Sequence, residues 1–395
     1  MQSGINTTHT IKSANRCLVL DLMRKSEALT IEEIIHSTRL SRPTVLSILD
    51  GLLSDNVIRR VGFAEATVGR QPALYAIDTT HHFAIGIDFE FPPMHLAITD
   101  LSGAIRYSTR WSCPFGMDKT EVIDLLIANI GAALEALELT WENIIGIGLG
   151  IPGTVDMHRN MSGIISRING WNETPLRTIL SQYCDVPIYV RNDAHLLALA
   201  AQSSLPELDK DFLYIAYRTG IGMAIVRNGR LEEGCLGNSG YIGHTTMDIN
   251  GDLCVCGKRG CLETFASKMA IVNKYHQAEN CGPDVDFDRI LALASEGDRT
   301  AVEILQTPGT YLGVALANCV KTLDISTIIV DDLHCASDHV FVRSICNAVN
   351  FYCSSYLQRP ITMITDQKKE ADSALGAALF VLNTFFREPR LRLSV

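Results

Sequence analysis

Three cysteines and a histidine in the middle of the chain have the types and spacing of metal ligands. Cys254, Cys256 and Cys261 stand within eight residues, and His244 precedes the first of them by ten. Structural zinc takes four nitrogen or sulfur ligands in a tetrahedron, and the glycines between these cysteines permit tight turns. The spacing therefore predicts a structural zinc site in a loop over residues 244–261. The alternative is a reduced loop without metal, whose thiols would be open to oxidation.

The other nine cysteines are scattered among apolar neighbours, so most of them are expected to be small core residues. They are Cys17, Cys113, Cys184, Cys235, Cys281, Cys319, Cys335, Cys346 and Cys353. A disulfide framework is not expected, because the N-terminal residues lack the apolar stretch of a secretion signal. No apolar run approaches the roughly 20 residues that span a bilayer. We expect a cytoplasmic protein without membrane insertion.

Near the N-terminus, a helix start carries side chains of the types that contact DNA. Ser41 is an N-cap, and Pro43 lies in the first turn, where its missing N–H has no cost. The helix would present Arg42, Thr44 and Ser47 to base edges in the major groove. Arginines in the following hairpin would reach phosphates or the minor groove. They are Arg59, Arg60 and Arg70.

The elements around this helix follow the winged helix-turn-helix pattern. Apolar spacing predicts helices over residues 13–27, 31–37 and 42–55 and strands over 57–58 and 73–77. Thr30 and Glu33 form a capping box before the second helix. Three helices followed by a hairpin predict a DNA-binding domain over residues 1–79. The alternative is a three-helix packing module with incidental arginines.

Charge is unevenly distributed along the chain. The formal net charge is −10, which argues against a protein that coats nucleic acid with its whole surface. Residues 1–72 hold nine Lys/Arg and seven Asp/Glu, a balance of +2, so the remainder carries −12. A slightly basic N-terminal segment attached to an acidic remainder is consistent with a small DNA-binding domain joined to another domain.

Residues 80–395 have the pattern of an α/β body. Apolar runs predict strands over residues 83–88, 94–100, 105–112, 144–150, 186–190, 211–217 and 223–227, with helices over 119–137 and 194–202. Helices near 301–320 and 340–357 have apolar faces that suit either a core or a subunit interface. The repetition of strands followed by a helix in two halves suggests a ribonuclease H-like body.

The chain resembles the ROK family (repressor, open reading frame, kinase) over almost its whole length. The matching segments are Leu40–Val45, Val57-Ile58, Gly69–Pro72, Ile151–Asp156, Asn192–Ala194, Tyr241–His244 and Cys254–Glu263. The resemblance implies an N-terminal winged helix-turn-helix and a two-lobed α/β body of the actin and sugar-kinase type. It also implies zinc at the Cys3His cluster. The branch that it points to is that of N-acetylglucosamine- and xylose-type transcriptional repressors.

The resemblance also implies a sugar-type effector in the cleft between the two lobes. The residues at the family's sugar-contacting positions are Asn192, Asp193, His244 and Glu263. In kinases of the family, the aspartate at position 193 deprotonates the attacking sugar hydroxyl. Asn192 and Asp193 also suit the N-cap of the helix that begins near Ala194, and capping is compatible with ligand contact.

Two positions depart from the family's sugar site. Tyr241 replaces a glutamate that precedes the histidine by three residues. A phenol offers one O–H and an aromatic face, so the ligand is something other than a plain hexose, or sugar binds weakly. Arg167 lies near a usual sugar-contacting asparagine and would meet a phosphate or carboxylate on the ligand. A surface salt bridge is the alternative for Arg167.

The segments that hold ATP in the family's kinases are altered. The first phosphate loop reads Asp-x-Gly-Gly-Thr in those kinases, whereas this chain has bulky residues and prolines over residues 88–93. Prolines lack the N–H donors that bind phosphate. The strand over residues 328–330 leads into Asp331 and Asp332 where the family has two glycines. Residues 219–222 keep a short glycine motif. We therefore expect no kinase activity.

Together these features predict a DNA-binding transcriptional regulator, most simply a repressor, of genes for sugar uptake or breakdown. Its expected partners are a double-stranded operator, a sugar-type effector and further copies of itself in a homodimer or homotetramer. One alternative is an active sugar kinase that carries a DNA-binding head. Another is a regulator controlled by a protein partner such as a sugar transporter component.

Overall fold

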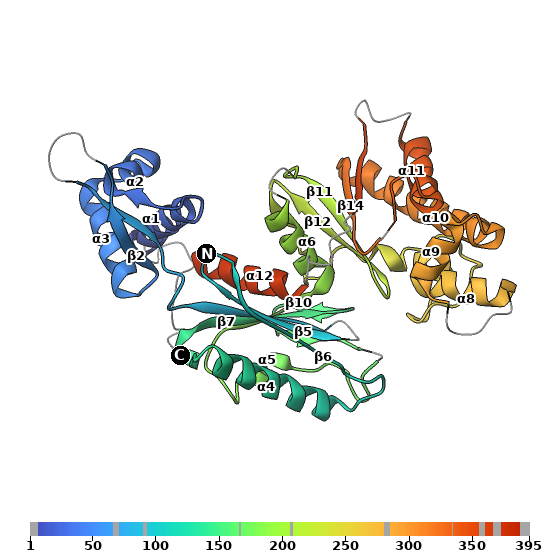
Figure 1. The fold of residues 1–395 in the computed structure, drawn as a ribbon, viewed down its shortest axis with the longest axis horizontal. Helices are drawn as coiled ribbons and strands as arrows, with labels where there is room; N and C mark the ends of the chain where they lie inside the picture. Colours follow the sequence, from blue (N-terminus) through green and yellow to red (C-terminus); the bar gives the residue numbers. More distant parts are fainter. Residues whose placement is uncertain are drawn as a thin grey trace. The chain divides into compact units, whose positions relative to one another are not determined.

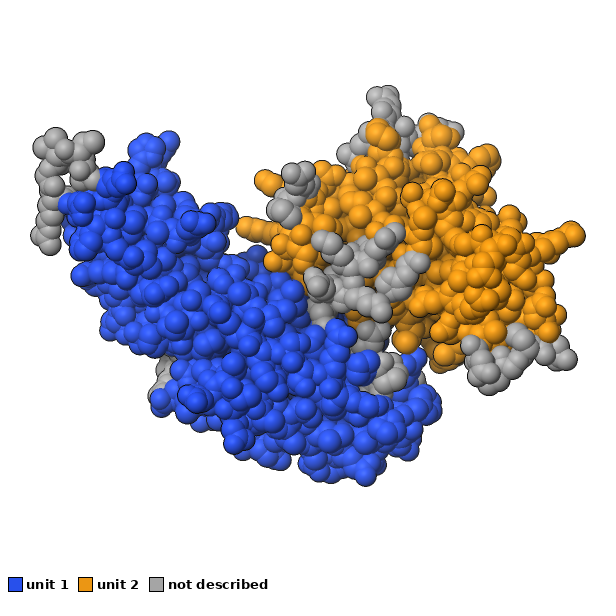
Figure 2. All heavy atoms as spheres, viewed as in Figure 1, with its two compact units in different colours: residues 1–196, 373–395 blue, residues 197–372 orange. Residues whose placement is uncertain are grey.

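A computed structural model describes residues 7–65, 71–89, 93–165, 167–205, 208–279, 285–333, 335–354, 360–365 and 373–387. The chain forms two compact units, shown in blue and orange in Figure 2. Unit 1 contains residues 1–196 and 373–395, and unit 2 contains residues 197–372. The chain therefore leaves unit 1 near Leu196 and returns to it at Ser373. No helix in the described ranges has the length and apolar character needed to cross a membrane.

The first part of unit 1 is a helical head with a small antiparallel sheet. Its elements are α1 (Thr7–Arg24), β1 (Leu29–Thr30), α2 (Ile31–Thr38), α3 (Arg42–Ser54), β2 (Ile58–Phe63) and β3 (Ala73–Ile77). The strand order is β1-β3-β2. Thr30 and Glu33 form the expected capping box, and Ser41 caps α3 with Pro43 in its first turn. Val45, Ile48 and Leu49 bury one face of α3.

The first helix differs from the predicted span of residues 13–27. It runs from Thr7 to Arg24, so it begins six residues and ends three residues earlier than predicted. The backbone N–H groups of Lys25 and Ser26 donate to carbonyls three residues earlier, which closes the helix in a tight turn. The strand β1 was not predicted, since two residues carry no periodic signal.

The rest of unit 1 is a three-layer α/β structure. Its sheet has the order β10-β7-β4-β5-β6, with β10, β7 and β4 parallel. The strands are β4 (Phe83–Asp88), β5 (Met94–Asp100), β6 (Ile105–Trp111), β7 (Ile144–Ile151) and β10 (Ile188–Asn192). The helices are α4 (Lys119–Ala136), α5 (Leu176–Leu180) and α12 (Ser373–Arg387), together with the first turn of α6 (Asp193–Ser204), which continues into unit 2. A short helix, η1 (Trp141–Asn143), and a small pair, β8 (Val155–Asp156) and β9 (Met161–Ser162), complete it.

The alternation of side chains along β4 assigns the two faces of this sheet. Ile85 and Ile87 belong to the apolar cluster that α4 and α5 cover, whereas Ala84 belongs to the cluster of α12. Figure 1 shows these helices on opposite sides of the sheet. A Cβ on Gly86 would lie 1.9 Å from the Ala374 carbonyl oxygen, and one on Gly148 would lie 2.4 Å from that of Ala377. Glycines in the strands therefore let α12 lie directly on the sheet.

The helix α12 also contacts the head. Apolar residues of α1 and α3 form one buried cluster with Leu382, Phe385 and Phe386 of α12. Arg24 Nη1 donates to Asn383 Oδ1 at 3.0 Å, and the Arg24 guanidinium lies 4.5 Å from the centroid of the Phe386 ring. These contacts attach the head to the remainder of unit 1 through α12.

Unit 2 is a second α/β structure with its own core. Its sheet has the order β13-β12-β11-β14-β15, in which β11, β14 and β15 are parallel. The strands are β11 (Phe212–Tyr217), β12 (Ile221–Arg227), β13 (Arg230–Leu231), β14 (Thr327–Val330) and β15 (Thr362–Thr365). The helices are η2 (Ile242–His244), α7 (Leu262–Ala266), α8 (Lys268–Glu279), α9 (Phe287–Ser295), α10 (Arg299–Leu323) and α11 (Val340–Cys353).

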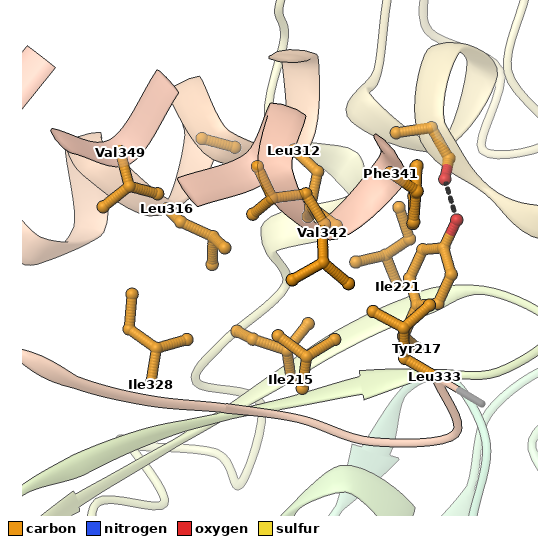
Figure 3. Packing of buried hydrophobic residues seen from close by; sticks show 14 of the residues in the cluster. Ile215, Tyr217, Ile221, Leu312, Leu316, Ile328, Leu333, Phe341, Val342 and Val349 are labelled. Carbon is orange, nitrogen blue, oxygen red and sulfur yellow. Dashed lines mark hydrogen bonds between the residues drawn. The ribbon is translucent and has the colours of Figure 1, made fainter. Parts of the chain in front are cut away.

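Side chains of α10 and α11 cover one face of this sheet, as Figure 3 shows. Leu312 and Leu316 of α10 and Val342 of α11 pack over Ile215 and Ile328. The buried Tyr217 hydroxyl donates to the Ala266 carbonyl oxygen at 2.7 Å. The apolar faces that the sequence left open between core and interface thus supply core residues.

Buried His95 in β5 gives unit 1 an expected dependence on pH. Its Nε2 lies 2.6 Å from Ser108 Oγ, and burial with the nearby Arg110 charge lowers the pKa from 6.5 to about 4. The unfolded chain therefore binds more protons than the folded chain between these values, so stability is lost as pH falls from about 6.5 toward 4. We expect a loss of about 2 kcal/mol between pH 7.5 and pH 5 in urea denaturation.

A His95→Gln variant is the control for this dependence. Glutamine keeps a hydrogen-bonding group toward Ser108 but does not titrate, so the variant should lose most of the difference between the two pH values. An unchanged pH dependence in the variant would show that other groups cause it.

Candidate functional site

The four predicted metal ligands lie together in unit 2. The ligand atoms of His244, Cys254, Cys256 and Cys261 are all within 4.8 Å of one another. His244 Nδ1 is 3.7 Å from Cys254 Sγ, and Cys256 Sγ is 3.6 Å from Cys261 Sγ. Three thiols and one imidazole converging on one point form a cluster that can hold a metal ion. The donor set is that of structural zinc.

The loop that carries the thiols is shaped by its own backbone. The Cys254 N–H donates to the Lys258 carbonyl oxygen at 2.7 Å, and the Gly257 N–H donates to that of Cys254 at 2.9 Å. Gly257 and Gly260 have φ values of 81° and 67°, which favour glycine. A Cβ on Gly260 would lie 1.5 Å from the Asp248 carbonyl oxygen. Both glycines therefore serve the turns that the sequence predicted.

The thiols differ in their surroundings. Burial raises the pKa of Cys261 to about 12, whereas the backbone N–H of Lys258 lowers the pKa of the exposed Cys256.

Among the cysteines outside the cluster, Cys235 departs from the expectation of a small core residue, because it is exposed. Cys281 lies outside the described residues.

Glu263 follows the metal cluster directly, on the short helix α7 that begins after Cys261. Its Oε1 accepts the Ile221 N–H at 2.9 Å, and its Oε2 lies 3.8 Å from His244 Nδ1. Cβ atoms on Gly220 and Gly243 would lie 2.6 and 2.8 Å from Oε1. One oxygen of Glu263 thus holds the turn between β11 and β12, while the other faces the histidine.

Tyr241, the residue in place of the family's glutamate, lies beside His244. The two rings are stacked at 16° with centroids 6.2 Å apart. The Tyr241 hydroxyl donates to Asn238 Oδ1 at 3.3 Å. Tyr241 and Glu263 thus each lie beside His244 in unit 2. Their roles toward an effector stay a prediction.

The other predicted effector residues lie in unit 1. Asn192 ends the parallel strand β10 and Asp193 begins α6, at the carboxyl edge of the sheet. The Asn192 amide donates to the Gly153 carbonyl oxygen at 3.0 Å, and its Oδ1 accepts the Ala194 N–H at 3.0 Å. Asp193 Oδ1 accepts the same N–H at 2.9 Å. Both residues thus bond to the helix start, and Asn192 also ties β10 to the segment after β7.

Arg167 lies in a half-buried position in the loop after β9. Its carbonyl oxygen accepts the Gly116 N–H at 2.9 Å, so the backbone of this loop is tied to the loop before α4. The contact of its guanidinium with a ligand anion stays a prediction.

In the two segments that differ from the family's ATP-binding motifs, the described residues contact other residues of their own unit. Phe89, directly after β4, is fully buried with its ring centroid 5.4 Å from that of Trp171. Residues 90–92 lie outside the described part of the chain. In unit 2, Asp331 pairs with Arg218 at 3.3 Å.

Asp332 is also paired, with Lys268 at 2.6 Å. Charge repulsion by the two aspartates is therefore a weaker argument against a nucleotide than the sequence indicated, because a cation accompanies each carboxylate. Their partners, Arg218 and Lys268, were missed because they are more than 60 residues away along the chain.

Four of the six predicted DNA-contacting side chains are exposed on the head. Arg42 and Ser47 are exposed at the start of α3, while Thr44 is half-buried with its hydroxyl 2.8 Å from that of Ser41. Arg59 and Arg60 are exposed on β2, and the Arg60 guanidinium lies 5.7 Å from the centroid of the Tyr75 ring. Arg70 lies outside the described residues.

Comparisons with known proteins cover nearly the whole length of the chain. The family model described as ROK family matches residues 84–384. The xylose repressor of Bacillus spizizenii is 26% identical over 376 residues, which cover 95% of this chain and 96% of that protein. The DNA-binding transcriptional dual regulator NagC of Escherichia coli is 24% identical over 390 residues, or 96% of this chain and 95% of that one.

A solved structure has a similar fold over both units and the head. It is that of a ROK family transcriptional regulator, a homolog of the E. coli MLC protein, with a TM-score of 0.80 and 22% identity. The similarity covers 96% of this chain and 97% of that chain. The two-lobed body that the sequence predicted is therefore the fold of this chain.

Proposed function

Because the chain belongs to the ROK family, we propose that it is a DNA-binding transcriptional regulator of genes for sugar uptake or breakdown, most simply a repressor. The observation that carries the proposal is the helical head, whose α3 presents exposed Arg42 and Ser47 while Val45 and Ile48 are buried. Relatives named as a repressor and as a DNA-binding transcriptional regulator align with the chain through this head, which a sugar kinase does not need.

In this proposal the head is a winged helix-turn-helix domain within residues 1–79. The N-terminal end of α3 enters the major groove, where Arg42, Thr44 and Ser47 meet base edges. The hairpin of β2 and β3 is the wing, and its arginines Arg59, Arg60 and Arg70 meet phosphates or the minor groove. A dimer would bind two half-sites related by two-fold symmetry, and we expect a homodimer or homotetramer in solution.

We further propose that the Cys3His cluster holds structural zinc. The ion would supply a fixed tetrahedral centre, because four protein ligands leave no open position for a substrate. Cys261 immediately precedes the helix of Glu263, so fixing this cysteine fixes where the Glu263 carboxylate lies. His244 turns Nδ1 toward Cys254, which leaves its Nε2 for a second partner.

The effector in this proposal is a sugar or sugar derivative, recognised by polar and aromatic side chains of the α/β body. The residues are Asn192, Asp193 and Arg167 of unit 1 and Tyr241, His244 and Glu263 of unit 2. Carboxylates accept hydrogen bonds from hydroxyl groups, and a neutral imidazole can donate through one nitrogen and accept through the other. Tyr241 adds an aromatic face suited to the apolar side of a sugar ring.

The helix α12 provides a route from this site to the head within unit 1. Arg191 directly precedes Asn192, and its guanidinium lies 4.5 Å from the centroid of the Phe380 ring in α12. Three and six residues further along the same helix, Asn383 and Phe386 contact Arg24 of the head. A displacement of the strand end at Asn192 would therefore be transmitted to the DNA-binding head through the single helix α12. In a dimer, such a movement would change the distance between the two heads, and a distance that no longer matches the half-site spacing weakens DNA binding.

Kinase activity is the alternative function. The buried Phe89 after β4 and the ion pairs of Asp331 and Asp332 are unlike a glycine-lined phosphate site. We expect no ADP formation in a coupled assay with ATP and mixed hexoses. Sugar-dependent ADP formation would favour a kinase with a DNA-binding head. Control by a transporter protein would instead appear as capture of that partner from membrane extracts.

Replacing Asp193 by alanine tests the effector site. We expect the variant to bind its operator with unchanged affinity but to lose release by the effector, because the carboxylate contacts the ligand and not DNA. Fluorescence anisotropy with a labelled operator measures both, using D-xylose, N-acetylglucosamine and a pool of hexoses as probes. The exposed Asp185 of the same unit provides the control variant Asp185→Ala. Normal release by Asp193→Ala would place the effector site elsewhere.

A further inference from the structure

An ion pair joins the first turns of α2 and α3 on the exposed side of the head. Arg42 Nη1 donates to Glu32 Oε1, and the two side chains are 57% and 65% exposed. Exposed pairs of this kind contribute at most about 1 kcal/mol to stability. The head has stronger sources of stability in its apolar core and its helix caps. The pair therefore is not needed for the fold of the head.

The neighbouring acidic residue, Glu33, makes different contacts. Glu33 Oε2 accepts the Thr30 N–H at 2.7 Å and the Thr30 hydroxyl at 2.8 Å, so its carboxylate is turned back on the start of α2. These hydrogen bonds, from the backbone first and the hydroxyl second, lower the pKa of Glu33. Of the two acids in this turn, only Glu32 reaches across to α3.

We propose that Glu32 is a positioning residue that holds Arg42 in the orientation needed to read a guanine base. This inference rests on the proposed DNA-binding function and names the residue pair that gives part of its specificity. An arginine carries its N–H donors in a planar fork. With one Nη1 proton on Glu32, the other donors remain to meet guanine O6 and N7 in the major groove.

The carboxylate contributes to specificity in two ways. It restricts a long side chain to one orientation before DNA arrives, which lowers the entropy lost on binding. It also repels phosphate oxygens, so Arg42 is discouraged from the sequence-independent contacts that an isolated arginine makes. When DNA displaces water, the attraction between Glu32 and Arg42 strengthens because the local dielectric falls.

The test compares variants of the full chain on a duplex selected by that chain from a random-sequence pool. Guanines of the selected site are replaced one at a time by 7-deazaguanine, which removes the N7 acceptor. We expect the wild type to lose about ten-fold in affinity at one guanine of each half-site. Glu32→Gln and Arg42→Ala should both lose this discrimination. The double variant should resemble Arg42→Ala alone, because Glu32 acts through Arg42.

The control is Glu27→Gln, which removes the same charge from an exposed position in the head outside the pair. It should keep the ten-fold preference. If Glu32→Gln instead binds all duplexes tighter by one common factor and keeps the preference, Glu32 acts only as a negative charge and the proposal is wrong. A wild type that selects a site but tolerates every 7-deazaguanine also overturns it. A wild type that selects no site overturns the proposed function itself, which is a separate result.

Discussion

Replacing Cys261 by serine is expected to reduce bound zinc from stoichiometric to trace amounts. Cys261 is fully buried, and its thiol is one of four ligand atoms within 4.8 Å of one another. Folding free energy is coupled to metal binding at such sites, where zinc-finger peptides gain about 10–16 kcal/mol from the ion. In this larger unit, whose α/β core folds around other contacts, we expect a loss of several kcal/mol. Elemental analysis and thermal denaturation measure the two effects.

The matched control for this substitution is Cys235→Ser, since Cys235 is an exposed cysteine of the same unit outside the cluster. It should keep its zinc and its melting temperature. Because Cys261 precedes the helix of Glu263, the Cys261→Ser variant should also respond poorly to effector. Full zinc content in Cys261→Ser would contradict the assignment of the four ligands.

Alanine at Gly376 is expected to destabilise unit 1 by about 3 kcal/mol, although alanine is the better helix former. A Cβ at this position would lie 1.8 Å from the Leu196 carbonyl oxygen and 2.5 Å from its carbon. Backbone atoms of α6 cannot move aside as the end of a flexible side chain can, so α12 would have to shift. Urea denaturation of the purified variant measures the change.

A second helical glycine provides the control. Gly131 lies in α4 and is exposed, and a Cβ there would have no heavy atom within 4 Å. The same substitution should stabilise the protein by about 0.5–1 kcal/mol at this site, because alanine loses less conformational entropy. Equal effects of Gly131→Ala and Gly376→Ala would show that α12 does not pack against α6 as described.

The metal cluster could be predicted from the sequence because its ligands are local. All four lie within residues 244–261, so a few turns suffice to bring them together, and glycines mark those turns. The strands β4 and β7 were predictable for a similar reason, since each is a continuous apolar run. The predicted N-caps at Thr30 and Ser41 likewise depend on residues within one helical turn.

Features that depend on distant segments could not be predicted in this way. Nothing in the sequence around Gly86 and Gly148 indicates that a helix from residues 373–387 lies on them. The partners Asp331 and Arg218 are 113 residues apart, and Glu32 and Arg42 belong to different helices. Such pairs are set by the packing of whole elements, which periodicity and spacing do not specify.

Capture of genomic DNA tests most directly whether this chain is a DNA-binding regulator controlled by an effector. Fragments of the genome that encodes the chain are bound by the zinc-replete full-length protein and sequenced, with and without a pool of sugars. The proposal predicts enrichment of a pseudo-palindromic site beside genes for sugar uptake or breakdown, with less enrichment when the pool contains the effector. Enrichment of no site at moderate salt, under either condition, would contradict the proposal.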